Sequence, residues 1–206
     1  MTSTQLIFSD TLVGMPSTKK DIITLPNGHL RQRSKKVGLL SDEVKQLIED
    51  MRSATLDWED SRKHEVGVAL AAIQIDRPLR LVIIRNNFDN KSDKSFHVFI
   101  NPKITKFEGT IKEDFEGCLS VKDIYGKVPR HEKVRISALN ENGQAIRVTA
   151  EGFLARVFQH EIDHTNGIVF IDHIKDKPEA FFVLTEEGHL DKLDYEKDIK
   201  NSSLLW

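Results

Sequence analysis

Residues 153–167 read FLARVFQHEIDHTNG, and this segment constrains the fold more than any other part of the chain. Apolar side chains cover much of its circumference when it is drawn as a helix, which predicts a helix buried inside the protein. His160 and His164 are four residues apart, so both imidazoles would lie on one face, with Glu161 beside the first. Imidazoles and carboxylates are costly to bury without a partner, so the pattern favours a metal site over hydrogen-bonded core histidines. Gly167 is a suitable residue to end the helix.

The chemistry of such a site depends on a third ligand. One class of metalloproteases has HExxHxxGxxH, but Phe170 stands where the last histidine would be. A second class uses a downstream glutamate. The third candidate is the only cysteine, Cys118, because a thiolate binds zinc or ferrous iron well. A lone cysteine is more often an ordinary core residue, so position alone does not choose among these alternatives. The downstream glutamates are Glu179, Glu186 and Glu187.

The other elements predict an α+β fold with mainly antiparallel sheets around the buried helix that carries HExxH. Ser41 is a fair N-cap for an amphipathic helix. Residues 79–85 and 96–102 are apolar, β-branched runs, and we expect the second strand to end at its proline. Residues 104–117 could add one or two strands, and the Asn-Gly pair at 142–143 predicts a hairpin. The apolar stripe of the first helix comprises Val44, Leu47, Ile48, Met51 and Thr55.

Composition narrows the class of protein. With 206 residues, we expect a single catalytic domain spanning 1–206, with a core at about 20–175 and a charged tail at 176–206 whose role the sequence does not reveal. A net charge of −2 excludes nucleic-acid binding by bulk charge, and no apolar run has the ~18 residues of a membrane helix. The start has no basic segment or long apolar run, and one cysteine suits a reducing compartment, so we expect a cytoplasmic protein.

Three segments together resemble the signature motifs of the peptide deformylase family, in the order that the family has them. The first resembles GxGxAAxQ, the second is EGCLS at 116–120, and the third matches QHExDH at 159–164. The resemblance covers roughly residues 20–175. Two positions depart from the family pattern: Ala69 stands where the second glycine is usual, and Thr165 where leucine is usual. The first motif is carried by Gly67, Ala71, Ala72 and Gln74, and a Pro-Arg pair that the family also has by Pro129 and Arg130.

The resemblance implies an enzyme that removes the formyl group from the N-terminal methionine of newly made chains. It implies a divalent metal, ferrous iron in many members, with zinc, nickel or cobalt also able to occupy the site, and water in the fourth place. Glu161 would act as general base and then acid, and the Gln74 amide and the Leu119 backbone N–H would stabilise the oxyanion. The implied metal ligands are Cys118, His160 and His164.

The same resemblance places the substrate in a groove. We expect Val68, Phe153 and Val157 to line an apolar pocket for methionine, and the substrate backbone to pair along residues 67–69 and 115–117. The remaining residues implied for the groove are Gly67, Ala69, Glu116 and Gly117. Asp163 and Arg130 would pair and brace the metal-binding helix. Formyl-methionyl nascent chains are the implied partners, with ribosome association and a bacterial cytoplasm as further expectations.

Three alternatives stay open from the residues alone. A metallopeptidase with a glutamate ligand would leave Cys118 dispensable and cut internal peptide bonds. A degenerate relative would bind nascent chains or another partner without catalysis, and Ala69 is the only motif change that favours it. A closed structural zinc site would need a fourth protein ligand, for which His173 is the nearest choice in the sequence.

Overall fold

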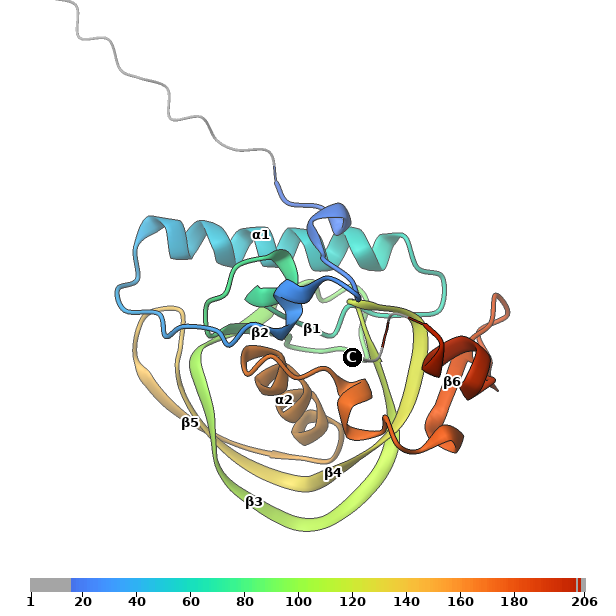
Figure 1. Ribbon diagram of the computed structural model, residues 1–206. Helices are drawn as coiled ribbons and strands as arrows, with labels where there is room; N and C mark the ends of the chain where they lie inside the picture. The colour runs from blue at the N-terminus through green and yellow to red at the C-terminus, as the bar shows by residue number, and fades with distance from the viewer. Residues whose placement is uncertain (1–15, 203, 205–206) are drawn as a thin grey trace, which may run out of the picture.

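Figure 1 presents a computed structural model of the protein that describes residues 16–202 and residue 204. A long antiparallel sheet curves around helix α2 (Gly152–Thr165), and helix α1 (Asp42–Asp60) lies across the opposite side of the molecule (Figure 1). The predicted α+β class, the antiparallel pairing and the buried helix with HExxH are therefore confirmed.

Within the described residues, seven strands form one sheet in the order β1-β2-β3-β4-β6-β7, and β5 pairs with β4 beside that path. All pairs run antiparallel. Strands β3 and β4 are long enough to join both ends of the sheet, so they carry the curvature that encloses α2. The strands are β1 (Ala69–Ala71), β2 (Leu81–Arg85), β3 (Phe96–Cys118), β4 (Val121–Leu139), β5 (Ala145–Glu151), β6 (Phe181–Leu184) and β7 (Leu190–Lys192).

Short helical turns connect these elements. Six of them are described, five of the 3₁₀ type and a last one of the π type. The 3₁₀ turn that follows β1 at once carries Gln74, so the end of β1 decides where this side chain lies. The turns are Lys19–Asp21, Gly28–Arg31, Ala72–Ile75, Phe170–His173, Pro178–Ala180 and Tyr195–Lys200.

Helix α1 forms where the apolar stripe predicts it. Ser41 precedes its first residue with extended backbone, although its hydroxyl bonds the Glu43 carboxylate rather than capping a backbone N–H. The five predicted stripe residues are all buried, and all of them except Thr55 pack against β1 and β2 in one apolar cluster. Helix α2 packs its apolar side against β2, β3, β4 and β5 in a second cluster. Gly167 follows α2 with a φ of +79°, as expected for a residue that ends a helix.

The prediction that the strand starting at residue 96 ends at Pro102 is wrong. Strand β3 continues to Cys118, and residues 104–117 belong to it rather than forming separate strands. Asn101 adopts a left-handed φ of +54°, and the pairing with β4 shifts register between Ile100 and Lys103. This irregularity places Pro102, which has no N–H to donate, outside the regular ladder, so the strand bends and goes on.

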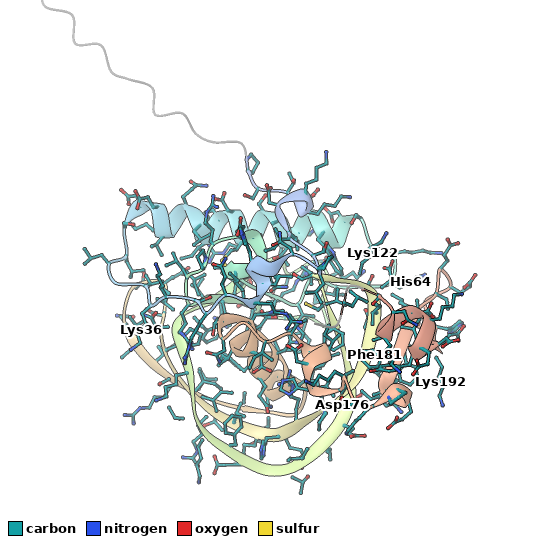
Figure 2. The ribbon with its side chains drawn as sticks, viewed as in Figure 1. Lys36, His64, Lys122, Asp176, Phe181 and Lys192 are labelled. Atoms are coloured by element: carbon teal, nitrogen blue, oxygen red, sulfur yellow. The ribbon has the colours of Figure 1, made fainter. Side chains whose placement is uncertain are left out.

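The charged tail contributes a third apolar cluster. Strand β6 pairs with residues 124–126 of β4, and β7 pairs with β6. Phe181, the first residue of β6, is 1% exposed, and Figure 2 labels it on the same side of the molecule as Lys192. The sequence missed this pairing because Pro178 and the surrounding charges hide a four-residue strand. Over the described ranges, no helix is long and apolar enough to cross a membrane.

Candidate metal and catalytic site

Cys118, His160 and His164 meet at the end of β3. Their ligand atoms all lie within 4.8 Å of one another. Nε2 of His164 is 3.2 Å from the Cys118 sulfur and 3.2 Å from Nε2 of His160. The two histidines occupy successive turns of α2, as their spacing predicts, and β3 brings the cysteine to them from outside the helix. The structure thus joins the three residues that the resemblance implies as ligands.

The alternative third ligands lie elsewhere. Phe170 stacks on His160 with ring planes 21° apart, so it covers the site without supplying a ligand atom. His173 bonds the Asp163 carboxylate at 2.7 Å through Nε2. Within the described residues, the metal-binding group contains neither His173 nor any of the downstream glutamates.

The chemistry of this donor set fits a divalent metal ion. A thiolate and two imidazoles suit ions such as zinc and ferrous iron, and three protein ligands leave one position open for catalysis. Nδ1 of His160 bonds Glu116 at 2.9 Å, which leaves its Nε2 for a metal. Among the described residues, the buried Oε2 of Glu161, which lines the same cavity, has no hydrogen-bond partner. An unpartnered buried carboxylate oxygen is costly, as expected of a site completed by a ligand.

Glu116 connects the metal ligands to two arginines. Its carboxylate accepts hydrogen bonds from Arg130 at 2.8 and 3.1 Å and from Arg156 at 2.9 Å. Burial by itself would raise the pKa of Glu116, but the bonds from His160 and Arg130 outweigh it and hold the pKa well below its usual value. Glu116 is therefore ionised in this setting, and it fixes the orientation of the His160 ring.

Arg130 and Asp163 pair as predicted. Nη1 of Arg130 donates to Asp163 at 2.5 Å, and Asp163 also bonds His173. Burial favours the neutral form of Asp163, yet these partners lower its pKa below the usual value. The pair joins β4 to the last turn of α2, so it holds the helix that carries both histidines against the sheet.

Glu161 lies inside the site. It is buried, and burial raises the pKa of its carboxyl group to about 7. A carboxylate with a pKa near neutrality can both take and return a proton at physiological pH. Glu161 lines the same cavity as Cys118 and His160, so its position suits general acid–base chemistry on a molecule bound beside the metal ligands.

Gln74 is buried rather than on the surface. Its Oε1 accepts the backbone N–H of Ala71 at 2.9 Å, which fixes the orientation of the amide. Its Nε2 then donates to Ser120 at 3.1 Å and lies 3.5 Å from the Cys118 sulfur. The amide N–H group therefore points to the metal-binding group, where a negative charge on a substrate oxygen would need it.

A cavity of about 280 Å³ opens beside the metal-binding group. The three residues predicted to form the methionine pocket all line it, with Phe153 half exposed at the rim. Gly67 is not among the lining residues; its N–H donates to Glu59 at 2.9 Å, and a Cβ there would lie 2.7 Å from Thr55. The predicted residues that do line the cavity are Val68, Ala69, Gln74, Glu116, Gly117, Cys118, Leu119, Phe153, Val157, His160 and Glu161.

The sequence reasoning missed several lining residues. Arg156 is the most informative, because a charge one turn before His160 in an otherwise apolar helix was visible in the sequence. Its partners are the Glu116 carboxylate and two backbone carbonyls, so it is neutralised within the wall. Glu65 and Val66 directly precede the first motif, and Phe115 lies in the stretch expected to pair with the substrate, but the sequence reasoning gave their side chains no role. Three further lining residues lie outside the motifs and had no local signal, namely Trp58, His64 and Tyr125.

Known proteins resemble this chain in sequence and in structure. Residues 19–180 match the family described as polypeptide deformylase. A peptide deformylase of Aquifex aeolicus is 42% identical over 156 residues, which cover 76% of this chain and 88% of that protein. A peptide deformylase of Psychrobacter arcticus is 41% identical over 153 residues, which cover 74% of this chain and 78% of that protein.

Solved structures agree with this result. A peptide deformylase of Synechococcus elongatus, solved in complex with actinonin, superposes with a TM-score of 0.66 at 34% identity, covering 84% of this chain and 86% of that one. A class I type b peptide deformylase of Acinetobacter baumannii, solved with Met-Ala-Ser bound, superposes with a TM-score of 0.65 at 31% identity. The match covers 74% of this chain and 96% of that one. The family match spans well over half of the chain, and the motifs that carry it surround the cavity. The chain therefore belongs to the polypeptide deformylase family.

Proposed function

We propose that the protein is a peptide deformylase, a metallohydrolase that removes the formyl group from the N-terminal formyl-methionine of newly synthesised proteins and releases formate. The observation that carries this proposal is the meeting of Cys118, His160 and His164 at 3.2 Å contacts beside a buried carboxylate. Membership of the family supports the same reaction. The whole chain, 1–206, would form the single catalytic domain.

The ion that we propose for the cell is ferrous iron, with zinc, nickel or cobalt able to occupy the same ligands in purified protein. When bound, the divalent ion acts as a Lewis acid and makes a water molecule a competent nucleophile near neutral pH. Cys118, His160 and His164 hold it, and Glu116 keeps the His160 ring in the orientation that the metal needs.

Glu161 moves the proton. Its carboxylate takes a proton from the water that attacks the formyl carbon, and the same carboxyl group passes the proton to the leaving amine. The pKa of about 7 that burial gives this group suits both directions of transfer. The C–N bond of the formamide then breaks, and formate and a free N-terminal methionine leave the site.

Two donors stabilise the oxyanion that develops on the formyl oxygen. Gln74 offers its side-chain amide, held in orientation by its bond to the Ala71 N–H. Leu119 offers its backbone N–H from the end of β3, next to Cys118. Donors that are already in place stabilise the transition state without reorganisation, and each contributes about 3–4 kcal/mol in comparable enzymes.

The lining of the cavity selects the substrate. Val68, Phe153 and Val157 supply an apolar surface for the methionine side chain. A family relative from Acinetobacter baumannii that was solved with Met-Ala-Ser bound supports this assignment. The peptide backbone would continue as an added strand along residues 67–69 and 115–117. A formyl carbon carries only hydrogen, so a tight site beside Gln74 excludes acetyl and longer acyl groups.

We propose that the substrates are formyl-methionyl nascent chains and that the protein works in a bacterial cytoplasm, close to the ribosome. The direct test compares formyl-Met-Ala-Ser with acetyl-Met-Ala-Ser, using protein purified without oxygen and loaded with ferrous iron. Oxygen is excluded because a thiolate ligand is oxidisable. We expect formate release from the first peptide and no acetate release from the second. Cleavage of internal peptide bonds without formate release would contradict the proposal.

A further inference from the structure

A hydrogen bond joins two walls of the cavity at its mouth. The hydroxyl of Tyr125 on β4 donates to Oε1 of Glu65, in the connection that follows α1, at 2.7 Å. Both residues line the cavity, and they are distant in the chain. We call this bond the latch. Burial, together with the bond to Glu65, raises the pKa of Tyr125, so the hydroxyl keeps its proton at neutral pH and stays a donor.

An ion pair runs beside the latch. Nη1 of Arg62, two residues after the end of α1, donates to Asp123 on β4 at 2.6 Å and lies 3.6 Å from the Glu65 carboxylate. The guanidinium of Arg62 sits over the ring of Trp58, 5.0 Å from its centre. Two neighbouring contacts therefore join the segment after α1 to β4. One is the hydrogen bond from the neutral Tyr125 hydroxyl to the Glu65 carboxylate, and the other is the ion pair between Arg62 and Asp123.

The ring of Tyr125 also packs on the stretch of β3 that we propose to pair with the substrate backbone. A Cβ at Gly117 would lie 2.6 Å from the ring of Tyr125, so the tyrosine packs directly on the Gly117 backbone. Gly117 belongs to the 115–117 stretch of β3, and Glu65 leads into the 67–69 stretch on the other side. The two stretches that would hold the peptide backbone are therefore connected to each other through Tyr125.

The C-terminal tail supports this arrangement from behind. Phe182 on β6 stands opposite Tyr125 on β4, and Phe115 packs edge-on against Phe182 with ring centres 4.9 Å apart. The turn that follows β6 reaches the other wall, where Nε2 of His64 lies 3.2 Å from the Glu186 carbonyl oxygen. Figure 2 labels His64 on the same side of the molecule as Phe181 and Lys192.

From these contacts we propose that Tyr125 is a positioning residue that sets the spacing of the two groove walls through its bond to Glu65, and thereby the binding of residues beyond the formyl-methionine. This inference rests on the proposed deformylase function. The formyl group and the methionine side chain sit beside the metal ligands and the apolar wall, so they do not depend on the latch. The following residues of the peptide lie between the walls and do.

The test is steady-state kinetics of Tyr125→Phe on formyl-Met-Ala-Ser and on formyl-methionine alone. Losing one hydrogen bond to a carboxylate should raise KM for the tripeptide by about tenfold, with kcat within about twofold of wild type. For formyl-methionine, kcat/KM should stay within about twofold. Glu65→Gln keeps an acceptor for the hydroxyl, so its KM should rise less than that of Tyr125→Phe. The double variant should be no worse than Tyr125→Phe, because both changes break one interaction.

The matched control is Tyr195→Phe, which removes the other tyrosine hydroxyl of the chain, bonded to the Lys175 carbonyl oxygen and outside the cavity lining. This variant should have the same kcat and KM as the wild type on both substrates. Equal losses on the two substrates, additive losses in the double variant, or an unchanged tripeptide KM would overturn the latch while an active wild type upholds the deformylase function. A wild-type protein that releases no formate would overturn both.

Discussion

Nδ1 of His160 and a carboxylate oxygen of Glu116 lie 2.9 Å apart, and this contact joins two of the three motifs. The EGCLS segment supplies the thiol of Cys118 and, two residues earlier, the carboxylate that orients a histidine of the QHExDH helix. Because Arg130 and Arg156 bond the same carboxylate, the orientation of the ring depends on a buried network of opposite charges.

Glu116→Gln tests that network. The amide can still accept a bond from His160, but two buried arginines lose an ionised partner. We expect the free energy of unfolding to fall by about 3–5 kcal/mol, because an uncompensated buried charge remains. Metal affinity should fall by about 10–100-fold, as for other residues that orient a ligand. Urea unfolding and competition with a chelator measure the two effects, and full retention of both would refute this role for Glu116.

Gln74→Leu tests the oxyanion donor. Leucine has a similar volume but no N–H group, so the transition state loses a donor while the metal ligands stay in place. We expect kcat to fall by about 10²–10³-fold. Metal content, measured in the same preparation, should match the wild type. A loss of activity in proportion to a loss of metal would assign Gln74 to metal retention instead.

Arg85→Met tests a buried ion pair behind the groove. Arg85 is 1% exposed and pairs with Glu59, whose carboxylate also accepts the Gly67 N–H. Removing the cation leaves that carboxylate buried with one backbone donor, so we expect a loss of about 3–5 kcal/mol in the free energy of unfolding. Adding Glu59→Met should restore part of it. The surface control Lys45→Met, which breaks a pair with Asp42, should leave the urea midpoint unchanged.

Ala69→Gly tests the departure from the family motif. Ala69 is 5% exposed, pairs with Ile84 on β2 and lines the cavity. Glycine in a strand should lower the free energy of unfolding by about 0.5–1 kcal/mol. We expect formate release from formyl-Met-Ala-Ser to change by no more than about fourfold, since one methyl group contributes about 0.8 kcal/mol at most. Activity that appears only in the glycine variant would favour the degenerate, non-catalytic alternative.

The sequence predicts most of the helix that carries the histidines, because a local period fixes which face they share. The stripe of α1 is predictable for the same reason. Cys118 is different: it reaches His164 only through the long strand β3, and its assignment depended on resemblance rather than on spacing. The expectation that the strand ends at Pro102 failed because Asn101 adopts a left-handed conformation, which lets the chain pass the proline without ending the strand.

The parts that were missed depend on contacts between distant segments. Nothing near Tyr125 in the sequence indicates that it bonds Glu65, and nothing in the charged tail indicates that four of its residues complete the sheet beside β4. Arg156 is the exception, since a lone charge in an apolar helix could have been taken as a sign of a buried carboxylate partner. The pairing of Arg130 with Asp163 was predictable only once the family motif had placed them together.

The central claim is that Cys118, His160 and His164 hold a metal on which Glu161 depends for its proton transfer. The most direct measurement is formate release from formyl-Met-Ala-Ser together with bound metal, in wild type, Cys118→Ala and Glu161→Ala, all prepared with ferrous iron without oxygen. We predict activity with one metal per chain in the wild type, loss of both in Cys118→Ala, and loss of activity alone in Glu161→Ala. Full activity in Cys118→Ala, or no formate from a folded, metal-loaded wild type, would contradict the account.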